Sequence, residues 1–447
     1  MLRNVFKKII ASVVIAAILP ASALFPAKTR ADDAVDSAAI IEAAIASGSH
    51  RCNVNAPRSG NVFMQLMGTF DTTSKDAILN QINSMRLEAC QNGYPDPRNR
   101  SHRLTMADYV PLRWSRGLED MAMLRAAEAT YTNHHIKPTG EDYVRSSYDV
   151  ASFAEALAWN GNISAGLSAW YSQRSAWNSG STSVSADYAA LINPSYTYCA
   201  MAGFNNTQAC EFTSQAGLDE SKIDVSQYNS QLAEIGANYV SGIAVTVPSG
   251  ACMIGATTRL AAVATVSVQG YSKRLTYSGI RILPTTWWTG SPDLVRVDNV
   301  GNATGVCSGM ANVYCKFNGV AYSSTVRVSD VTLVRNFASR LYSVALNRAP
   351  DAAGLDYWTG RLSNHEITGT QAAYGFFFSQ EFLGANLSNE EYVIRLYRTF
   401  LDRDPEAQGY NYWLTRLADG ASRADVFYGF SGSAEFAGIC AYAGINP

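Results

Sequence analysis

Histidine is scarce in this chain, with five in 447 residues, and the common catalytic signatures are missing. There is no G-x-S-x-G, no H-E-x-x-H and no phosphate-binding glycine loop, which argues against the familiar serine hydrolases, zinc proteases and P-loop enzymes. No C-x-x-C occurs, which argues against structural zinc and thiol redox chemistry. A Ser-His-Asp triad assembled from distant residues stays open, although no pattern points to one.

The chain also lacks an apolar run long enough to span a bilayer, which needs roughly 20 residues. Its one long apolar run covers residues 9–19, after the basic Arg3, Lys7 and Lys8 and before an A-x-A pattern at residues 21–23. This arrangement predicts a secretory signal peptide over residues 1–31, with cleavage after Ala23 or after Ala31. We therefore expect a secreted protein with no transmembrane segment in its mature chain.

Basic residues are too few for a general nucleic-acid binder. The full chain has 35 Lys and Arg against 37 Asp and Glu, and the predicted signal peptide removes five basic residues and no acidic ones. The mature chain is thus acidic, and we expect no nucleic acid among its partners. Its remaining length corresponds to about two to four domains.

Eight cysteines remain after the predicted cleavage, an even number that favours disulfides in an exported chain. Cys199 and Cys210 flank a turn-like segment and are the first pair that we expect. Cys252, Cys307 and Cys315 are also expected to pair, but their partners stay open.

The periodicity of the chain changes three times. Residues 32–75 are rich in Ala, Ser and Gly and are interpreted as a linker with one short helix at 34–45. Helical periodicity begins at Lys75, continues after Trp114 and recurs over residues 163–177, with short strands predicted near 188–192 and 198–203. Residues 238–330 are rich in Val, Thr, Ser and Gly, and their short runs of alternating apolar and polar residues predict an antiparallel sandwich. From residue 331 the pattern is helical again.

The last region is a duplication. Residues 341–362 read LYSVALNRAPDAAGLDYWTGRL, and residues 396–417 read LYRTFLDRDPEAQGYNYWLTRL. The similarity between the copies continues in YGFFFSQEF and YGFSGSAEF, so the repeats cover about 334–386 and 389–440. A repeat of this length is a supersecondary unit that stacks on its copy. Trp358 and Trp413 are predicted to pack its helices, and its acidic residues are expected to cap helices and form ion pairs, with calcium as the alternative.

Six short blocks follow one another over residues 76–215: I-N-x-x-R at 82–86, P-L-R-W-S at 111–115, R-A-A-E at 125–128, H-x-x-P-x-G at 135–140, A-E-A-L-A at 154–158 and D-Y-x-x-L-I-N-P at 187–194. The series resembles the CAP superfamily of cysteine-rich secretory, antigen-5 and pathogenesis-related proteins. The resemblance implies an α-β-α sandwich, an α+β fold.

The CAP resemblance also implies a cleft with two His and two acidic residues that can hold a divalent metal. Its positions fall on His135, Glu155, Gln173 and Asp187, so two of the four depart from the family pattern. Three interpretations stay open: a polar cleft without catalysis, a weak zinc or calcium site formed by His135, Glu155 and Asp187, and a hydrolytic site using His135 and Glu155.

Two further resemblances complete a multidomain fold. The run from Thr286-Trp287-Trp288 through Gly301 to Thr304-Gly305 resembles a group 2 bacterial Ig-like domain, which implies an all-β sandwich over 238–330. The duplicated region, 331–447, resembles an all-α domain of unknown function found in secreted bacterial proteins.

These patterns favour a secreted binding or adhesion protein of three modules, whose partner is a polymer or protein of the cell envelope or of a host. The alternatives are a CAP-type hydrolase, with or without metal, and a self-assembling surface protein. We expect binding rather than catalysis, because the cleft departs from the metal-binding pattern.

Overall fold

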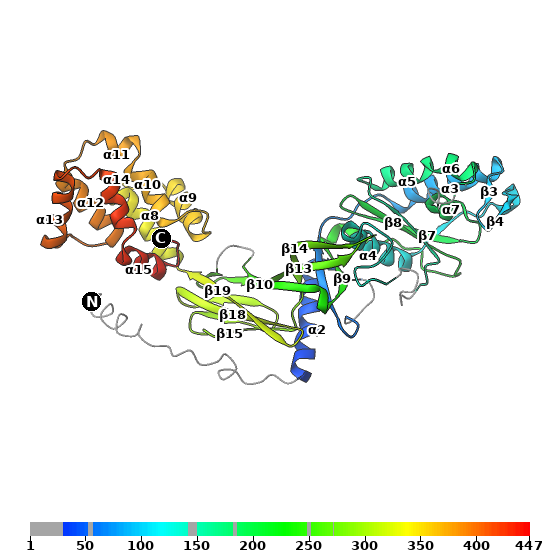
Figure 1. The fold of residues 1–447 in the computed structure, drawn as a ribbon, viewed down its shortest axis with the longest axis horizontal. Helices are drawn as coiled ribbons and strands as arrows, with labels where there is room; N and C mark the ends of the chain where they lie inside the picture. The colour runs from blue at the N-terminus through cyan, green and yellow to red at the C-terminus, as the bar shows by residue number, and fades with distance from the viewer. Residues whose placement is uncertain (1–29, 52–56, 142–149, 182–185, 248–251, 271) are drawn as a thin grey trace.

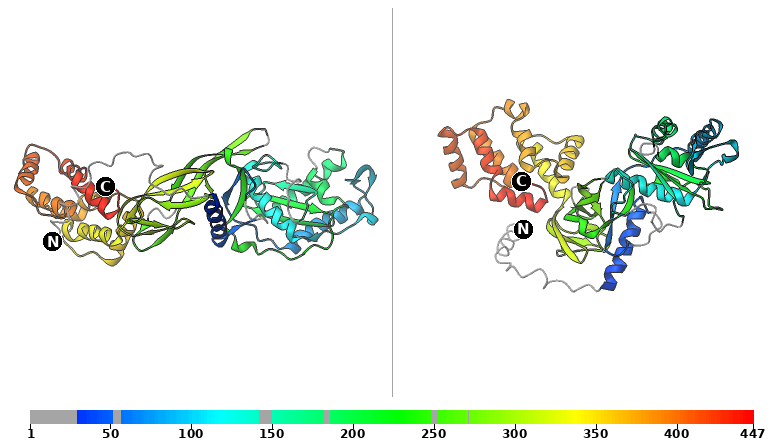
Figure 2. Two further views of the ribbon diagram at one scale, coloured as in Figure 1. Left: turned by 90° about the horizontal axis from the view of Figure 1, so that it is seen from below. Right: turned by 45° about the vertical axis from the view of Figure 1, so that its right-hand side comes forward.

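The structure is a computed structural model that describes residues 30–51, 57–141, 150–181, 186–247, 252–270 and 272–447. The predicted signal peptide, apart from its last two residues, lies outside the described residues. Figures 1 and 2 show three regions in a row: a mixed α/β region, a strand-rich middle and a helical end. No helix within the described residues combines the length and apolar character needed to cross a membrane.

The mixed region is built on a four-stranded sheet of order β5-β7-β8-β6, in which β7 and β8 form an antiparallel hairpin and β5 runs parallel to β7. Its elements in chain order are α3 (Lys75–Gln91), β3 (Pro95–Asp96), β4 (Asn99–Arg103), η2 (Met106–Asp108), β5 (Arg113–Trp114), α4 (Arg116–Thr132), β6 (Ala154–Ala158), α5 (Ile163–Ser172), α6 (Arg174–Asn178), α7 (Ala186–Ile192), β7 (Tyr198–Phe204) and β8 (Thr207–Thr213).

Serine caps start the first two helices where the sequence predicts them. The Ser74 and Ser115 hydroxyls accept hydrogen bonds from the backbone N–H groups of Ala77 and Leu118, which satisfies donors that have no partner inside the helix. The strand predicted near 188–192 is wrong, because this segment is helix α7. Its buried residues, Tyr188, Leu191 and Ile192, follow the i, i+3, i+4 spacing of a helix face.

The middle region contains sheets of six, four and three strands, with orders β1-β9-β2-β14-β13-β10, β11-β19-β18-β15 and β12-β17-β16. The strands are β1 (Ser49–His50), β2 (Asn61–Met67), β9 (Ser230–Gly236), β10 (Val240–Thr246), β11 (Cys252–Met253), β12 (Thr257–Arg259), β13 (Ala261–Gln269), β14 (Arg274–Ile282), β15 (Thr286–Thr289), β16 (Val295–Val297), β17 (Asn302–Gly305), β18 (Gly309–Phe317) and β19 (Val320–Ser329), with turns η4 (Val225–Gln227) and η5 (Ala237–Tyr239).

The linker interpretation of residues 32–75 is wrong for much of this segment. Strand β2 lies inside the six-stranded sheet, between β9 and β14, and α2 (Arg30–Ala46) covers part of that sheet with the buried Ile41 and Ala44. The sheet therefore begins before residue 75 in the chain and encloses the α/β region as an insertion. All seven residues of N-V-F-M-Q-L-M pair with residues of β9 about 170 positions later, a pairing that local periodicity cannot predict.

The helical end holds two copies of a four-helix unit, whereas the repeat pattern predicts a unit of three helices, in the order helix, loop, helix, helix. The first copy is α8 (Val331–Arg340) with η6 (Leu341–Ala345), α9 (Ala352–Ser363), α10 (Gly369–Phe377) and α11 (Gln380–Gly384); the second is α12 (Asn389–Leu401), α13 (Ala407–Ala418), α14 (Arg423–Ser431) and α15 (Ala434–Ala443). Both copies contribute to one hydrophobic core. The two tryptophans pack as predicted, with Trp358 on Phe376 and Trp413 on Phe430.

The acidic residues of the repeats act as caps and ion-pair partners. Asp351 accepts a hydrogen bond from the Gly354 N–H at the start of α9, over 2.7 Å. Four more of these acidic residues form ion pairs with arginines, as Arg335–Asp356, Arg340–Asp402, Arg398–Asp404 and Arg403–Glu406. These contacts give each carboxylate a role that needs no calcium ion.

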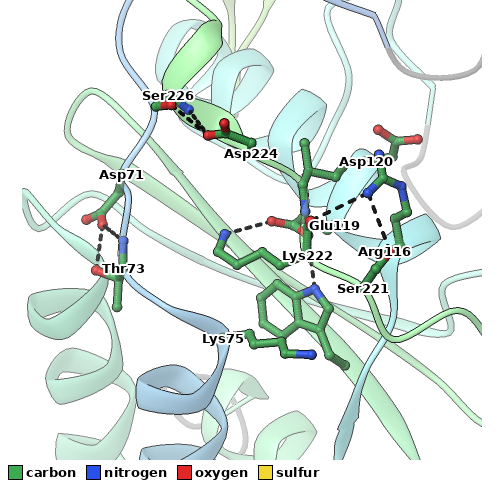
Figure 3. A network of polar contacts seen from close by, with 12 residues as sticks. Asp71, Thr73, Lys75, Arg116, Glu119, Asp120, Ser221, Lys222, Asp224 and Ser226 are labelled. Atoms are coloured by element: carbon green, nitrogen blue, oxygen red, sulfur yellow. Dashed lines mark hydrogen bonds and ion pairs between the residues drawn. The ribbon is translucent and has the colours of Figure 1, made fainter.

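A buried carboxylate ties the α/β region to the segment that leaves it (Figure 3). Glu119, 1% exposed, accepts hydrogen bonds from Trp114 Nε1 at 3.0 Å, Lys222 Nζ at 2.8 Å and the Ile223 N–H at 2.9 Å. Because all three donors converge on one side chain of α4, residues 222 and 223 are held against that helix on their way to β9. This contact therefore anchors the segment between β8 and β9 on α4.

The seven cysteines that the structure describes are free thiols, so the expected Cys199–Cys210 bridge is not formed. In the β7–β8 ladder Cys199 faces Phe212 and Cys210 faces Met201, which makes the two cysteines diagonal neighbours. The two thiols interact with one another, and burial together with this contact raises the pKa of Cys210 well above its usual value. Cys252, Cys307 and Cys315 are also unpaired with one another, and Cys52 lies outside the described residues.

Candidate functional site

The four cleft positions come from four different elements of the α/β region. His135 follows the C-terminal end of α4, Glu155 lies in β6, Gln173 joins α5 to α6, and Asp187 lies in the first turn of α7. The fold brings them together as two directly bonded pairs, His135 with Glu155 and Gln173 with Asp187. Asp187 also interacts electrostatically with both His135 and Glu155, so the two pairs face one another.

Glu155 is the centre of the first pair. His135 Nδ1 lies 2.7 Å from Glu155 Oε1, and since a carboxylate only accepts, Nδ1 carries the proton. Arg125 donates to both oxygens of Glu155, from Nε at 2.6 Å and from Nη2 at 3.3 Å. Three donors therefore occupy the carboxylate, whose side chain is fully buried, while the His135 side chain is 39% exposed.

Arg125 contacts several groups on this side of the cleft. It is fully buried in α4, pairs with Glu128 one turn further on, and donates to the His135 carbonyl oxygen over 2.8 Å. Burial opposes the charge on Arg125, but Glu155 and Glu128 outweigh it and raise its pKa. For Glu155 burial is likewise outweighed by the Arg125 charge and by hydrogen bonds from His135 and Arg125, which hold its pKa below the usual value.

A second carboxyl group lies against Glu155. Glu211 of β8 is directly opposite Glu155 in the β6–β8 ladder and is completely buried. Ser152 donates to Glu211 Oε2 over 2.7 Å, while Oε1 has no donor among the described residues. Burial and the neighbouring Glu155 carboxylate raise the pKa of Glu211 well above its usual value. A neutral Glu211, with its proton directed at Glu155, satisfies both groups.

This protonation leads to a prediction for Glu211→Gln. A carboxyl whose folded pKa is raised makes stability fall as pH rises above its unfolded pKa of about 4.3. Glutamine imitates the protonated acid at every pH. We therefore expect the variant to equal the wild type near pH 4 and to be more stable by about 1 kcal/mol or more at pH 8, measured by urea unfolding across this range. A variant that loses stability equally at both pH values would mean that Glu211 is charged.

The second pair occupies the other half of the cleft. Gln173 Nε2 donates to Asp187 Oδ2 over 3.0 Å, and Gln173 Oε1 accepts from the Tyr188 N–H over 3.3 Å. Burial raises the pKa of Asp187, and the hydrogen bond from Gln173 opposes that rise. Both ends of the Gln173 amide are thus engaged in positioning α7.

The side-chain set does not fit a divalent metal. Glu155 is occupied by Arg125 and His135, Gln173 is a poor ligand where the resemblance calls for a carboxylate, and a guanidinium next to the site repels a cation. Among the described residues no group of three His, Cys, Asp or Glu side chains has the arrangement of a metal site. What the cleft offers chemically is an exposed imidazole oriented by a buried carboxylate.

Arg125, Glu128 and Glu211 complete the site and were not predicted as site residues. Arg125 and Glu128 were read only as part of a helix, although two charged residues three apart in the apolar run A-M-L-R-A-A-E-A could have signalled a buried ion pair. No sequence signal identifies Glu211, because its contact with Glu155 depends on the strand register.

Two known families match separate parts of the chain. Residues 79–215 match the cysteine-rich secretory protein family (CAP), and residues 326–386 and 383–440 each match a domain of unknown function (DUF4214). The chain is therefore modular, with a CAP domain followed by a duplicated domain. No curated protein matches the chain.

Proposed function

We propose that this chain is a secreted binding protein of the bacterial envelope that attaches to an envelope or host polymer and is not an enzyme. The observation that carries the proposal is the occupied Glu155 carboxylate: three donors from Arg125 and His135 hold it, and Gln173 takes the place of the second acid. In this proposal residues 1–31 direct export, the middle region acts as an Ig-like spacer, and the duplicated domain supplies a second binding unit.

A sedimentation assay tests the proposal directly. The mature protein, from residue 32, is mixed with insoluble bacterial cell walls and with washed insoluble polysaccharides, then pelleted. We expect wild type and His135→Ala to pellet equally, since attachment does not need the imidazole. A protein that stays in the supernatant with every polymer would overturn the proposal.

A CAP-type hydrolase is the second candidate, favoured by the 2.7 Å contact between His135 and Glu155 and by the exposure of the imidazole. In that reading Glu155 orients the ring and the exposed imidazole edge acts as the general base. Calorimetric titration with zinc and with calcium, on wild type and His135→Ala, tests whether such a hydrolase would hold a metal. We expect identical traces; micromolar binding lost in His135→Ala would show a working metal site and would contradict the proposal above.

A further inference from the structure

The exposed tyrosines of this protein are concentrated in the duplicated domain. Among the described residues, the five tyrosines with the largest exposure all lie there: Tyr357 at 53%, Tyr374 at 45%, Tyr412 at 55%, Tyr428 at 53% and Tyr442 at 57%. Four of them form two equivalent pairs, because Tyr412 repeats Tyr357 and Tyr428 repeats Tyr374. Two positions of the repeat therefore carry an exposed tyrosine in both copies.

The neighbours of these tyrosines have changed between the copies, whereas the tyrosines have not. In α9 and α13 the exposed Ala353 and Asp356 correspond to Gln408 and Asn411. In α10 and α14 even buried positions differ, since Ala373 corresponds to Phe427. These tyrosines contact other rings, with Tyr374 stacked on Phe378 at 4.4 Å, yet each stays about half exposed. The retention of half-exposed rings in both copies indicates a role at the surface in addition to these contacts.

The aromatic side chains form three groups of ring contacts, with a Tyr-Trp pair in each copy and a tyrosine pair between the copies. Tyr357 meets Trp358 with ring centroids 5.3 Å apart, and the Trp358 ring lies against Gly375, where an added Cβ would stand 3.3 Å from it. Tyr374, next to Gly375, stacks on Tyr428 of the other copy at 6.4 Å and 25°. We call Tyr357, Trp358, Tyr374, Tyr428, Trp413 and Tyr412 the aromatic track.

The second half of the track mirrors the first. Gly429 follows Tyr428 and leaves room for the Trp413 ring, and Trp413 meets Tyr412 with centroids 4.9 Å apart. Figure 1 shows α10 and α14 side by side, with α9 and α13 on opposite sides of them. The Tyr374–Tyr428 contact thus joins the two copies, and each copy adds one Tyr-Trp pair.

Neighbouring side chains hold the rings of the track in place, and hydroxyl and guanidinium groups lie at their edges. The Arg361 guanidinium donates to the Tyr357 hydroxyl over 2.9 Å and lies over its ring, and Glu366 pairs with the same guanidinium. Trp358 and Trp413 are half-buried on Phe376 and Phe430, so their rings are held in place. The more exposed rings of the track are its four tyrosines, at 45–55%, and a tyrosine offers a flat apolar face with a hydroxyl at its edge.

We propose that the aromatic track binds a neutral glycan chain, with successive sugar rings stacked on the tyrosine and tryptophan faces. The inference rests on the proposed binding function and names its ligand class. A sugar ring has C–H faces that suit an aromatic face and hydroxyl edges that suit phenol and guanidinium groups. Rings spread along one surface fit a polymer with repeated units. Tyrosine, tryptophan and arginine are also enriched at protein interfaces, so a second copy of this chain is the rival occupant that the test must distinguish.

Affinity electrophoresis of the full mature chain tests the inference. The probes are soluble neutral polysaccharides cast into the gel: an α-glucan, a β-glucan, a mannan, a galactan and glycol chitin. We expect at least one to retard the wild type, with a loss of affinity of 3- to 10-fold for Tyr357→Ala or Tyr412→Ala. The double variant should lose 30-fold or more, because two half-sites act on one chain. Tyr442→Ala, an equally exposed tyrosine outside the track, is the matched control and should bind like the wild type.

Each other result identifies a different error. Retardation that survives in the double variant overturns the track but leaves the proposed binding function standing. Attachment to cell walls without retardation by any of the five polysaccharides overturns the neutral glycan. A wild-type dimer that Tyr374→Ala/Tyr428→Ala converts to a monomer, measured by light scattering, assigns the track to a second copy instead. Since the substituted tyrosines are exposed, unchanged circular dichroism of each variant verifies its fold.

Discussion

Replacing Arg125 by Met is expected to destabilise the CAP domain by about 3–5 kcal/mol at pH 7, the usual result of removing one partner from a buried ion pair. Arg125 is fully buried and neutralises Glu155 and Glu128, whose side chains are 0% and 3% exposed. Methionine keeps much of the volume but leaves both carboxylates without a counter-charge, beside Glu211. Urea unfolding followed by tryptophan fluorescence measures the loss, since Trp114 and Trp170 are in this domain's core.

The pH dependence of this variant separates charge from packing. In the wild type, Glu155 has a lowered pKa, so its stabilising contribution is present above its unfolded pKa of about 4.3 and is lost as pH falls through the folded value. Without Arg125, burial raises the pKa of Glu155, and the variant loses stability as pH rises above about 4.3. The difference between variant and wild type should therefore be larger at pH 7 than at pH 4.5. A difference that does not change with pH would mean that lost packing alone explains it.

Arg113→Met is the matched control for the removal of an arginine. Arg113 pairs with Glu220 at the surface of the same domain, and its side chain is 60% exposed. Exposed pairs contribute roughly 0–1 kcal/mol, so we expect almost no change. The contrast isolates the effect of burial on an ion pair.

The sequence predicted the elements that depend on local signals. Helical periodicity from Lys75 and after Trp114 predicted α3 and α4, and the duplicated Trp358 and Trp413 predicted where the repeat helices pack. Strand β2 was missed because its stability comes from β9 and β14, which are far away in the chain. Local propensity carries no information about such partners.

The same distinction applies to the cleft. Short motifs identified His135, Glu155, Gln173 and Asp187, and the fold brings these residues together. The chemistry of the cleft, however, depends on which groups occupy the lone pairs of Glu155, and those donors come from Arg125 and His135 through tertiary contacts. Glu211 reaches Glu155 only through the register of β6 with β8. Residue identity therefore indicated the place of the site but not the state of its carboxylates.

Replacing Phe400 by Ala is expected to destabilise the duplicated domain by about 3–5 kcal/mol, the usual cost of a cavity left by a buried phenylalanine. Phe400 is 0% exposed and meets Phe436 at 4.7 Å, Phe427 at 5.2 Å and Phe377 at 5.9 Å between ring centroids. Phe377 belongs to the first copy and the other two to the second. One ring therefore joins the cores of both copies.

The result for Phe400→Ala also decides whether the two copies fold as one unit. The first copy has Ala345 at the matching position, so the shared core contains a single large ring there rather than two. Hydrogen exchange should show that the variant loses protection in α9 and α10 of the first copy as well as in α13 and α14, because neither copy can close its core alone. Loss confined to the second copy would contradict a shared core. Leu383→Ala, at a position 57% exposed, is the control and should change neither stability nor exchange. A shared core also matters for the surface, because only a domain whose two copies fold together would hold the two halves of the aromatic track in register.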